Sequence, residues 1–303
     1  MVMRTAGPSE PCVAGKALLI AGVVLKTARL KSENYVQLED ALAFIKELSK
    51  SGPRTDIFTL LGDVNNPAPG YSFYHEYEKI AVLPITTYDE WFTTRLHNKP
   101  RNMIRKALKS GIEVRLEGFT DSLLEGVKGI YDESPVRQGK RNRHYKKTLD
   151  VLKVEHGTFL DRSQFISAYF EAEMIGFAKL TFCQEHAVVM NFLSKYSYRN
   201  KAVNNAILAK AVEICAERKM KCLVYGALGG GGTQGLDEFK TANGFECVEV
   251  PRYVVPLTWQ GKLALKAALH RELAQQMPNW FVRAAAKLRQ QWNTLRFGAA
   301  RPA

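Results

Sequence analysis

The chain has 303 residues, of which 46% are hydrophobic and 24% are charged, which is ordinary for a soluble globular protein with an ample core. No run of about 18 apolar residues occurs, so we expect no transmembrane helix, and five scattered cysteines argue against a disulfide framework and for a reducing compartment. The formal net charge of +13 favours polyanionic partners, such as nucleic acid, anionic lipid, nucleotide phosphates or acidic glycans.

The N-terminal part predicts a small accessory α/β segment. Residues 1–11 have the composition of a disordered leader, and the apolar stretch 12–25 predicts a buried strand or helix, with a signal peptide as the lesser alternative. Apolar spacing over 34–50 predicts an amphipathic helix, and strands are expected at 55–64 and 73–85. These residues carry no recognisable chemistry.

A strongly basic helical stretch extends from Thr87 to Ser110. Thr87 is a suitable N-cap, and acidic residues occupy the first turn, where they complement the helix dipole. The remainder carries a dense set of cations, namely Arg95, Lys99, Arg101, Arg105, Lys106 and Lys109. The ordinary interpretation of such a run is a solvated helix face, and a functional helix is the alternative that stays open.

An unusual basic loop, 131–147, follows a strand expected at 112–119 and a helix that Asp121 caps. Its arginines can hold a carboxylate or phosphate by paired donors, and its histidine can accept a proton near neutral pH. The loop therefore either binds a ligand through these groups or is a solvated loop without a ligand. The predicted substrate-binding residues are Arg137, Gln138, His144 and Tyr145.

A second helix is predicted at 149–160, and a β-hairpin follows it. Its two strands are expected at 163–173 and 174–185, and the chain is expected to turn around 173–176, where Gly176 lies.

The stretch 186–244 organises the chain. A strand rich in β-branched and aromatic residues is predicted at 186–198, a helix at 202–219, a short apolar strand at 221–228 and a short helix at 235–245 that Asn243-Gly244 stops. A strand that feeds a helix and returns to a neighbouring strand is a crossover unit, and ligands usually bind at the carboxyl ends of its strands.

This order resembles the second half of the GNAT acyltransferase fold, and GLDEFKTANGF followed by ECVEVPRYVVPLT is similar to its Fem-type branch, which includes the aminoacyltransferases that build peptidoglycan bridges. The resemblance covers roughly residues 90–258. It implies an α/β (α+β) fold with a mixed central sheet flanked by helices. We expect the acyltransferase domain at 87–258, an accessory segment at 1–86 that is a degenerate half domain or an unrelated layer, and basic helices at 259–303.

The resemblance also implies catalytic residues. In Fem-type enzymes a lysine in a Phe-Lys motif lies at the active site, and Lys240 matches it. Tyr225 ends the strand before the glycine-rich loop, near where a GNAT general acid often sits, with a half-buried structural tyrosine as the equal alternative. Tyr253 is expected to reach the same cleft, and Arg252 beside it is expected to bind substrate.

The acyl donor is expected between the two splayed central strands, with its pyrophosphate at the amino end of the following helix. The expected donor-binding residues are Leu193, Ser194, Arg199, Asn200, Lys201, Ala202 and Asn204. A GNAT pyrophosphate loop uses glycine so that the backbone can approach phosphate closely, but the segment 198–206 contains no glycine and Ala202 is its best substitute. This departure puts acetyl-CoA in doubt and leaves room for aminoacyl-tRNA.

Beyond Thr258 the chain is helical and basic, with one break at Pro278 and several aromatic side chains. A basic helix with aromatic anchors can lie on an anionic membrane surface, and the alternative is a tail that packs on the domain or on a dimer partner.

The sequence therefore predicts an N-acyltransferase that moves an acyl group from acyl-CoA to an amine, on an aminosugar or a cell-envelope precursor, without a metal. One alternative is an aminoacyl-tRNA-dependent transferase, which the net charge favours because tRNA binding is largely phosphate neutralisation. Another is a non-catalytic module that binds nucleic acid or anionic membrane. We expect a cytoplasmic protein, with membrane association at the inner surface as an option, and leave the oligomeric state open.

Overall fold

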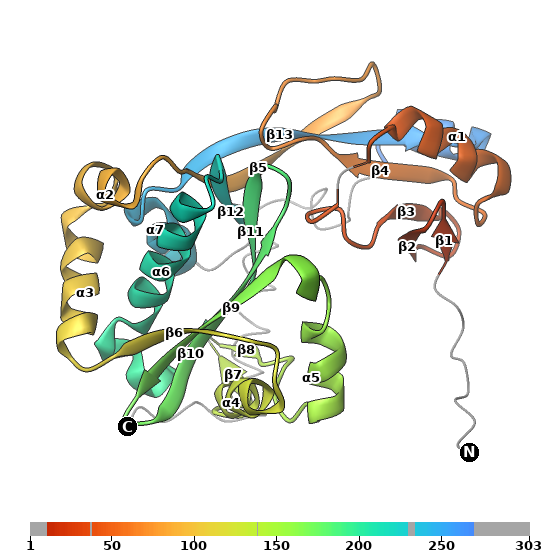
Figure 1. Ribbon diagram of the computed structural model, residues 1–303. Helices are drawn as coiled ribbons and strands as arrows, with labels where there is room; N and C mark the ends of the chain where they lie inside the picture. The colour runs from red at the N-terminus through yellow and green to blue at the C-terminus, as the bar shows by residue number, and fades with distance from the viewer. Residues whose placement is uncertain (1–10, 37, 138, 230–233, 270–303) are drawn as a thin grey trace. The chain divides into compact units, whose positions relative to one another are not determined.

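The computed structural model describes residues 11–269 except 37, 138 and 230–233, and this part of the chain divides into two compact units (Figure 1). The first unit holds 11–79 and 248–269, and the second holds 80–247. The second unit is thus inserted in the first along the chain. The boundaries predicted at 86 and 258 differ from this division, because the chain passes from one unit to the other within the strands His75–Pro84 and Glu246–Pro256.

The first unit contains strands in the order β1-β2-β3-β4-β13, where β4 lies between β3 and β13. Their bounds are Cys12–Val13, Lys16–Ala21, Thr27–Leu30, Ile57–Leu61 and Glu246–Pro256. Helix α1 (Ala41–Ser51) buries Phe44, Ile45 and Leu48 against the core of this unit. The helix begins at Ala41 rather than at residue 34, because the Asp40 carboxylate accepts from the backbone N–H of Ala43 at 2.9 Å and caps it there.

Strand β5 (His75–Pro84) leads into the second unit, where the predicted helix 87–110 is broken. Thr87 caps α2 (Tyr88–Glu90) as expected, η1 (Trp91–Arg95) is a π-turn, and α3 spans Asn98–Lys109. Pro100 lacks the N–H that a continuous helix would offer to the Leu96 carbonyl, so that carbonyl accepts from Arg101 at 2.9 Å instead. Proline is tolerated in the first turn of α3, where its N–H is not needed.

Strands of the second unit lie in the order β5-β12-β11-β10-β9-β6. Their remaining bounds are β6 Glu113–Glu117, β9 Ser163–Phe170, β10 Glu173–Phe182, β11 His186–Ser194 and β12 Cys222–Ala227. Helix α6 (Val203–Glu217) connects β11 to the parallel strand β12 and covers one face of the sheet, and α4 (Asp121–Tyr131) and α5 (Leu149–His156) cover the other (Figure 1). The predicted mixed sheet with flanking helices is confirmed.

Three local predictions in this unit are wrong in detail. The hairpin turns at Glu171-Ala172, where φ is 49° and 66°. Gly176 instead lies inside β10, where α6 packs closely over it, and a Cβ at this position would stand 2.7 Å from a Val203 methyl. Thr120, not Asp121, caps α4, because its hydroxyl accepts from Leu123 at 3.2 Å. The basic loop contains a short hairpin, β7 (Val136–Arg137) with β8 (Lys140–Arg141).

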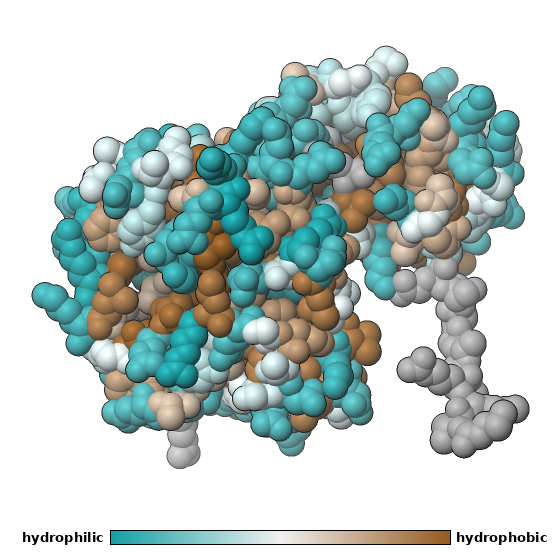
Figure 2. Space-filling model, viewed as in Figure 1, coloured by the Kyte–Doolittle hydropathy of each residue, from teal (hydrophilic) through white to brown (hydrophobic). Residues whose placement is uncertain are grey.

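Short elements complete the described chain. Two 3-10 turns, η2 and η3, span Leu160–Arg162 and Tyr196–Lys201, and helices α7 and α8 span Gln234–Ala242 and Trp259–Lys266. None of the helices in these described parts has the length and apolar composition that a membrane crossing needs. Hydrophilic residues cover most of the visible surface, and hydrophobic residues also reach it over the middle of the second unit (Figure 2), as is usual for folded proteins. The predicted tail beyond residue 269 lies outside the described residues.

Candidate functional site

The two parallel strands β11 and β12 pair at their amino-terminal ends and then separate. The ladder joins His186 to Cys222, Ala187 to Leu223 and Val188 to Val224, and within the described chain no further pair joins the two strands, although β11 continues to Ser194. A register shift in the β10–β11 ladder, next to Met190, accompanies the separation. The carboxyl ends of parallel strands are where α/β folds usually bind ligands, so this opening is the candidate site.

Lys240 and Tyr225, which were predicted separately, meet beside this opening. The Lys240 ammonium lies 4.9 Å from the centre of the Tyr225 ring and donates a hydrogen bond to the Ala227 carbonyl at 2.7 Å. Lys240 is only 3% exposed, and burial lowers its pKa while Asp237 opposes that change. An ammonium that is nearly removed from water interacts strongly with any negative charge that develops near it.

Aromatic rings surround the Tyr225 side chain. The Phe192 ring from β11 lies 5.4 Å from it, and the Phe245 ring lies 5.9 Å from it. Burial raises the pKa of Tyr225 well above its usual range, so its hydroxyl keeps its proton at neutral pH. The pair therefore offers a proton donor and a cation at one place.

Asn243 holds helix α7, and with it Lys240, in position. Its side chain is 1% exposed and donates to the Phe239 carbonyl at 2.7 Å, and its own carbonyl accepts from the Trp91 indole at 2.9 Å. Its carboxamide oxygen accepts from Asn205 on α6 at 3.4 Å. The sequence identified Asn243 only as a helix stop, because contacts with residues so far along the chain leave no local signal.

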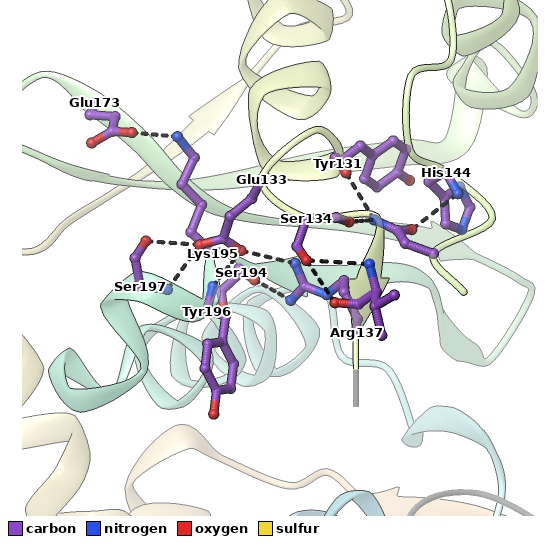
Figure 3. A network of polar contacts seen from close by, with 12 residues as sticks. Tyr131, Glu133, Ser134, Arg137, His144, Glu173, Ser194, Lys195, Tyr196 and Ser197 are labelled. Atoms are coloured by element: carbon purple, nitrogen blue, oxygen red, sulfur yellow. Dashed lines mark hydrogen bonds and ion pairs between the residues drawn. The ribbon is translucent and has the colours of Figure 1, made fainter. Parts of the chain in front are cut away.

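The loop after β11 is tied down by a carboxylate that the sequence did not single out. Glu133 accepts from the backbone N–H groups of Tyr196 at 2.7 Å and Ser197 at 2.9 Å, and from the Ser197 hydroxyl at 2.8 Å (Figure 3). Arg137 donates to the Ser194 carbonyl at 2.6 Å and pairs with Glu133 at 3.3 Å. The loop that would hold a donor pyrophosphate thus begins with two N–H groups bound to an anion of the protein itself.

Other predicted donor-binding residues lie in or next to this loop. Leu193 and Ser194 end β11, whereas Arg199, Asn200 and Lys201 belong to the 3-10 turn. Ala202 has φ 56° and ψ 34°, the left-handed conformation that favours glycine, so it does replace the missing glycine in backbone geometry. Asn204 lies in the first turn of α6, where its carboxamide oxygen is buried without a hydrogen-bond partner.

The basic loop residues are largely engaged within the protein. The Arg137 contacts hold β7 against the end of β11. The centre of the His144 ring lies 4.4 Å from that of the Tyr131 ring, and its Nε2 accepts from Arg143 at 3.2 Å. Burial, aided by Lys147, lowers the pKa of His144 to about 4, so its imidazole is neutral and only weakly basic near neutral pH. Tyr145 is half-buried beside Lys146. Gln138 lies outside the described residues.

Arg252 and Tyr253 belong to the first unit, and its internal contacts account for both. Tyr253 is 2% exposed, and its hydroxyl oxygen accepts from the Gly70 N–H at 2.8 Å. The Arg252 guanidinium pairs with Glu33 at 3.0 Å and with Glu78. These contacts hold both residues in the packing of the first unit.

In the part of the chain that the structure describes, His, Cys, Asp and Glu side chains form no group of three that could hold a metal ion. No protein-family model and no curated protein sequence matches the chain.

Solved structures do resemble it. FemX superposes with a TM-score of 0.61 at 12% identity, over 84% of this chain and 87% of that one. The C-terminal domain of a putative lysylphosphatidylglycerol synthetase from Agrobacterium fabrum gives 0.54 at 11% identity, over 83% and 84%. L-PGS from Bacillus licheniformis gives 0.53 at 13% identity, over 86% and 88%. The chain therefore has the GNAT-like fold that these structures share.

Proposed function

We propose that this protein is a transferase that moves an aminoacyl group from aminoacyl-tRNA to an acceptor, with Lys240 and Tyr225 at the reaction centre. The observation that carries the choice of donor is the Glu133 carboxylate on the N–H groups of Tyr196 and Ser197. A coenzyme A pyrophosphate needs free N–H groups in this loop, and a resident carboxylate both occupies two of them and repels a second anion.

The similar structures support an aminoacyl rather than an acetyl group. The Fem-type branch includes aminoacyltransferases that build peptidoglycan bridges, and the name lysylphosphatidylglycerol synthetase describes formation of an aminoacylated lipid. An amine or hydroxyl on a cell-envelope precursor or lipid is accordingly the acceptor class that we propose.

The charge of the second unit also fits a tRNA donor. Helix α3 exposes four cations, Lys99, Arg105, Lys106 and Lys109, whereas Arg101 is turned inward and binds backbone carbonyls. Neutralised phosphates release counterions, which drives nucleic-acid binding and makes it sensitive to salt.

The chemistry follows from the two side chains. The acceptor attacks the ester carbonyl carbon, and a tetrahedral intermediate forms with negative charge on the former carbonyl oxygen, which the buried Lys240 ammonium stabilises. The bond between that carbon and the ribose oxygen then breaks. The Tyr225 hydroxyl gives its proton to the leaving ribose oxygen and regains one from the attacking group, so no net charge is created.

The first test compares donors and one catalytic substitution. We expect aminoacyl-tRNA, but not acetyl-CoA, to raise the melting temperature, because a ligand at about 100 times its Kd stabilises the native state by about 2.7 kcal/mol. Lys240→Met should lower turnover by about 100-fold or more, the usual cost of removing a group that stabilises an oxyanion.

Lys221→Met is the matched control, since Lys221 is 63% exposed and lies on the surface. Stabilisation and turnover with acetyl-CoA would reject the proposed donor and favour a simple acyl-CoA enzyme. Binding of tRNA with no turnover that depends on Lys240 would instead favour a non-catalytic module.

A further inference from the structure

An apolar and basic patch lies on the first unit, where no part of the proposed transferase chemistry is found. It consists of the loop tip after β2 and the outer face of α8. Its members are Val23, Val24, Trp259, Lys262, Leu263 and Lys266, and we call this set the α8 patch.

The apolar members of the α8 patch are exposed to an unusual extent. Val23 and Val24 are each 95% exposed, Trp259 is 67% exposed and Leu263 is 56% exposed. The opposite face of α8 is well packed, with Ala264 buried against Ile57 and Val254. Helix α8 therefore has apolar residues on both of its faces, and only one of these faces is covered.

The two parts of the patch are fixed to each other by Asp56. Its carboxylate accepts from the Lys26 backbone N–H at 2.9 Å, at the end of the valine loop, and from the Thr258 hydroxyl at 2.8 Å, at the N-cap of α8. Leu25 and Leu265 both pack against the buried cluster that Ala264 forms with Ile57 and Val254. The loop tip and the helix thus form one preorganised surface rather than two independent ones.

A glycine brings α8 close enough for this arrangement. A Cβ on Gly261 would stand 2.0 Å from the Asp56 carbonyl oxygen, a distance that real atoms do not adopt. The same helix is capped by Thr258, whose hydroxyl accepts from the Gly261 N–H at 3.1 Å. The close approach of Gly261 to Asp56 and the Thr258 cap therefore fix the orientation of the exposed face of α8.

We propose that the α8 patch docks the protein on the surface of a lipid bilayer that contains anionic lipids. Trp259 and Leu263 lie one helical turn apart, and so do Lys262 and Lys266, so an apolar strip runs beside a cationic one. Tryptophan favours the level of the lipid headgroups, the valines and the leucine enter the acyl boundary, and the lysines face anionic headgroups. The positive charge of the strip is what favours a bilayer over an apolar protein partner.

The test measures co-sedimentation of the full chain with vesicles of phosphatidylcholine alone and of phosphatidylcholine mixed with phosphatidylglycerol, without any donor. We expect binding to the mixed vesicles. The substitutions Val23→Ser, Val24→Ser and Trp259→Ser together should weaken binding at least about tenfold. Lys262→Gln with Lys266→Gln should weaken it by about fivefold for each lysine, the effect of roughly one juxtamembrane charge.

Matched controls lie in the second unit. Leu108→Ser with Val154→Ser removes apolar groups that are 61% and 76% exposed, and Lys153→Gln with Lys221→Gln removes two cations that are 57% and 63% exposed. Both controls should bind the mixed vesicles as the wild type does. All the changed side chains are exposed, so unchanged melting temperatures will show that folding is intact.

Several results would overturn the proposal. These are equal binding by wild type and patch variants, equal loss in the control variants, or equal binding to neutral vesicles. Sedimentation velocity without vesicles gives a further check: a dimer that the patch substitutions dissociate, with vesicle binding unaffected, would assign the patch to self-association. Because no donor is present, failure here leaves the proposed transferase function untouched.

Discussion

At the scale of single residues, Glu133 has the clearest consequence for chemistry. It lies four residues before Arg137 in the sequence, and its carboxylate binds the start of the loop after β11 (Figure 3). We predict that Glu133→Ala destabilises the protein by about 2 kcal/mol, because it leaves charge-assisted hydrogen bonds unmade. We also predict that acetyl-CoA raises the melting temperature of this variant although it does not raise that of the wild type.

Glu185→Ala serves as the control, since Glu185 is an exposed carboxylate that pairs with Lys221. If acetyl-CoA affects wild type and Glu133→Ala alike, Glu133 is not what excludes the pyrophosphate.

A second residue-scale prediction concerns His156, which is 1% exposed. Burial, and then the neighbouring Lys179, lower its pKa from 6.5 to about 4. The unfolded chain therefore binds a proton between about pH 6.5 and pH 4 that the folded protein does not bind, so stability falls as the pH is lowered through this window and the loss is complete below it. His156 alone should contribute a loss of about 2 kcal/mol at pH 5 relative to pH 7.

Urea unfolding at the two pH values measures this effect. His144, whose pKa is also lowered to about 4, contributes in the same direction. His156→Gln should therefore flatten the pH dependence without abolishing it. An unchanged slope in that variant would show that the pKa of His156 is the same in the folded and the unfolded protein.

At the scale of elements, the hairpin between β9 and β10 has a turn whose residues do not suit it. Glu171 and Ala172 both have positive φ, whereas a two-residue hairpin turn of this kind favours Asn-Gly. Glu171→Asn with Ala172→Gly should stabilise the protein by about 1 kcal/mol, because the left-handed conformation costs an ordinary residue energy. Thermal unfolding measures the gain, and a lower melting temperature would contradict it.

Hydrophobic periodicity is what allowed helices and strands to be located from the sequence. It located β10, β11, α6 and β12 because their apolar residues recur at the spacing of a strand or a helix. It could not show that Arg101 would turn inward to bind the carbonyls at the end of η1, nor that Glu133 would bind the loop after β11. Both contacts depend on tertiary structure, because the sequence around a charged residue does not show whether its side chain is solvated or bound to a backbone group. Family resemblance, rather than periodicity, pointed to Lys240.

At the scale of the whole molecule, the net charge of +13 makes nucleic-acid binding sensitive to salt. We expect the logarithm of the affinity for aminoacyl-tRNA to fall linearly with the logarithm of salt concentration. Lys99→Gln with Lys106→Gln should reduce the slope by about 0.7 to 0.9 for each tRNA phosphate that these lysines no longer neutralise. Fluorescence anisotropy with labelled tRNA measures the slopes.

Lys46→Gln with Lys50→Gln, two exposed cations on α1, changes the net charge equally and should leave the slope as it is. Equal reductions in both variants would mean that tRNA binding depends on the net charge of the protein rather than on the lysines of helix α3.

The insertion of the second unit within the first also has a consequence for biosynthesis. Strand β13 pairs with β4, yet residues 80–247 leave the ribosome between them. At a translation rate of about 5–20 residues per second, roughly ten to thirty seconds pass between the synthesis of β4 and that of β13, and the inserted unit can already fold in this interval. During that interval one edge of β4 offers unpaired backbone groups to other chains. Nascent chains that stall before residue 248 should therefore recruit chaperones to their N-terminal strands, and chains released after β13 has emerged should not.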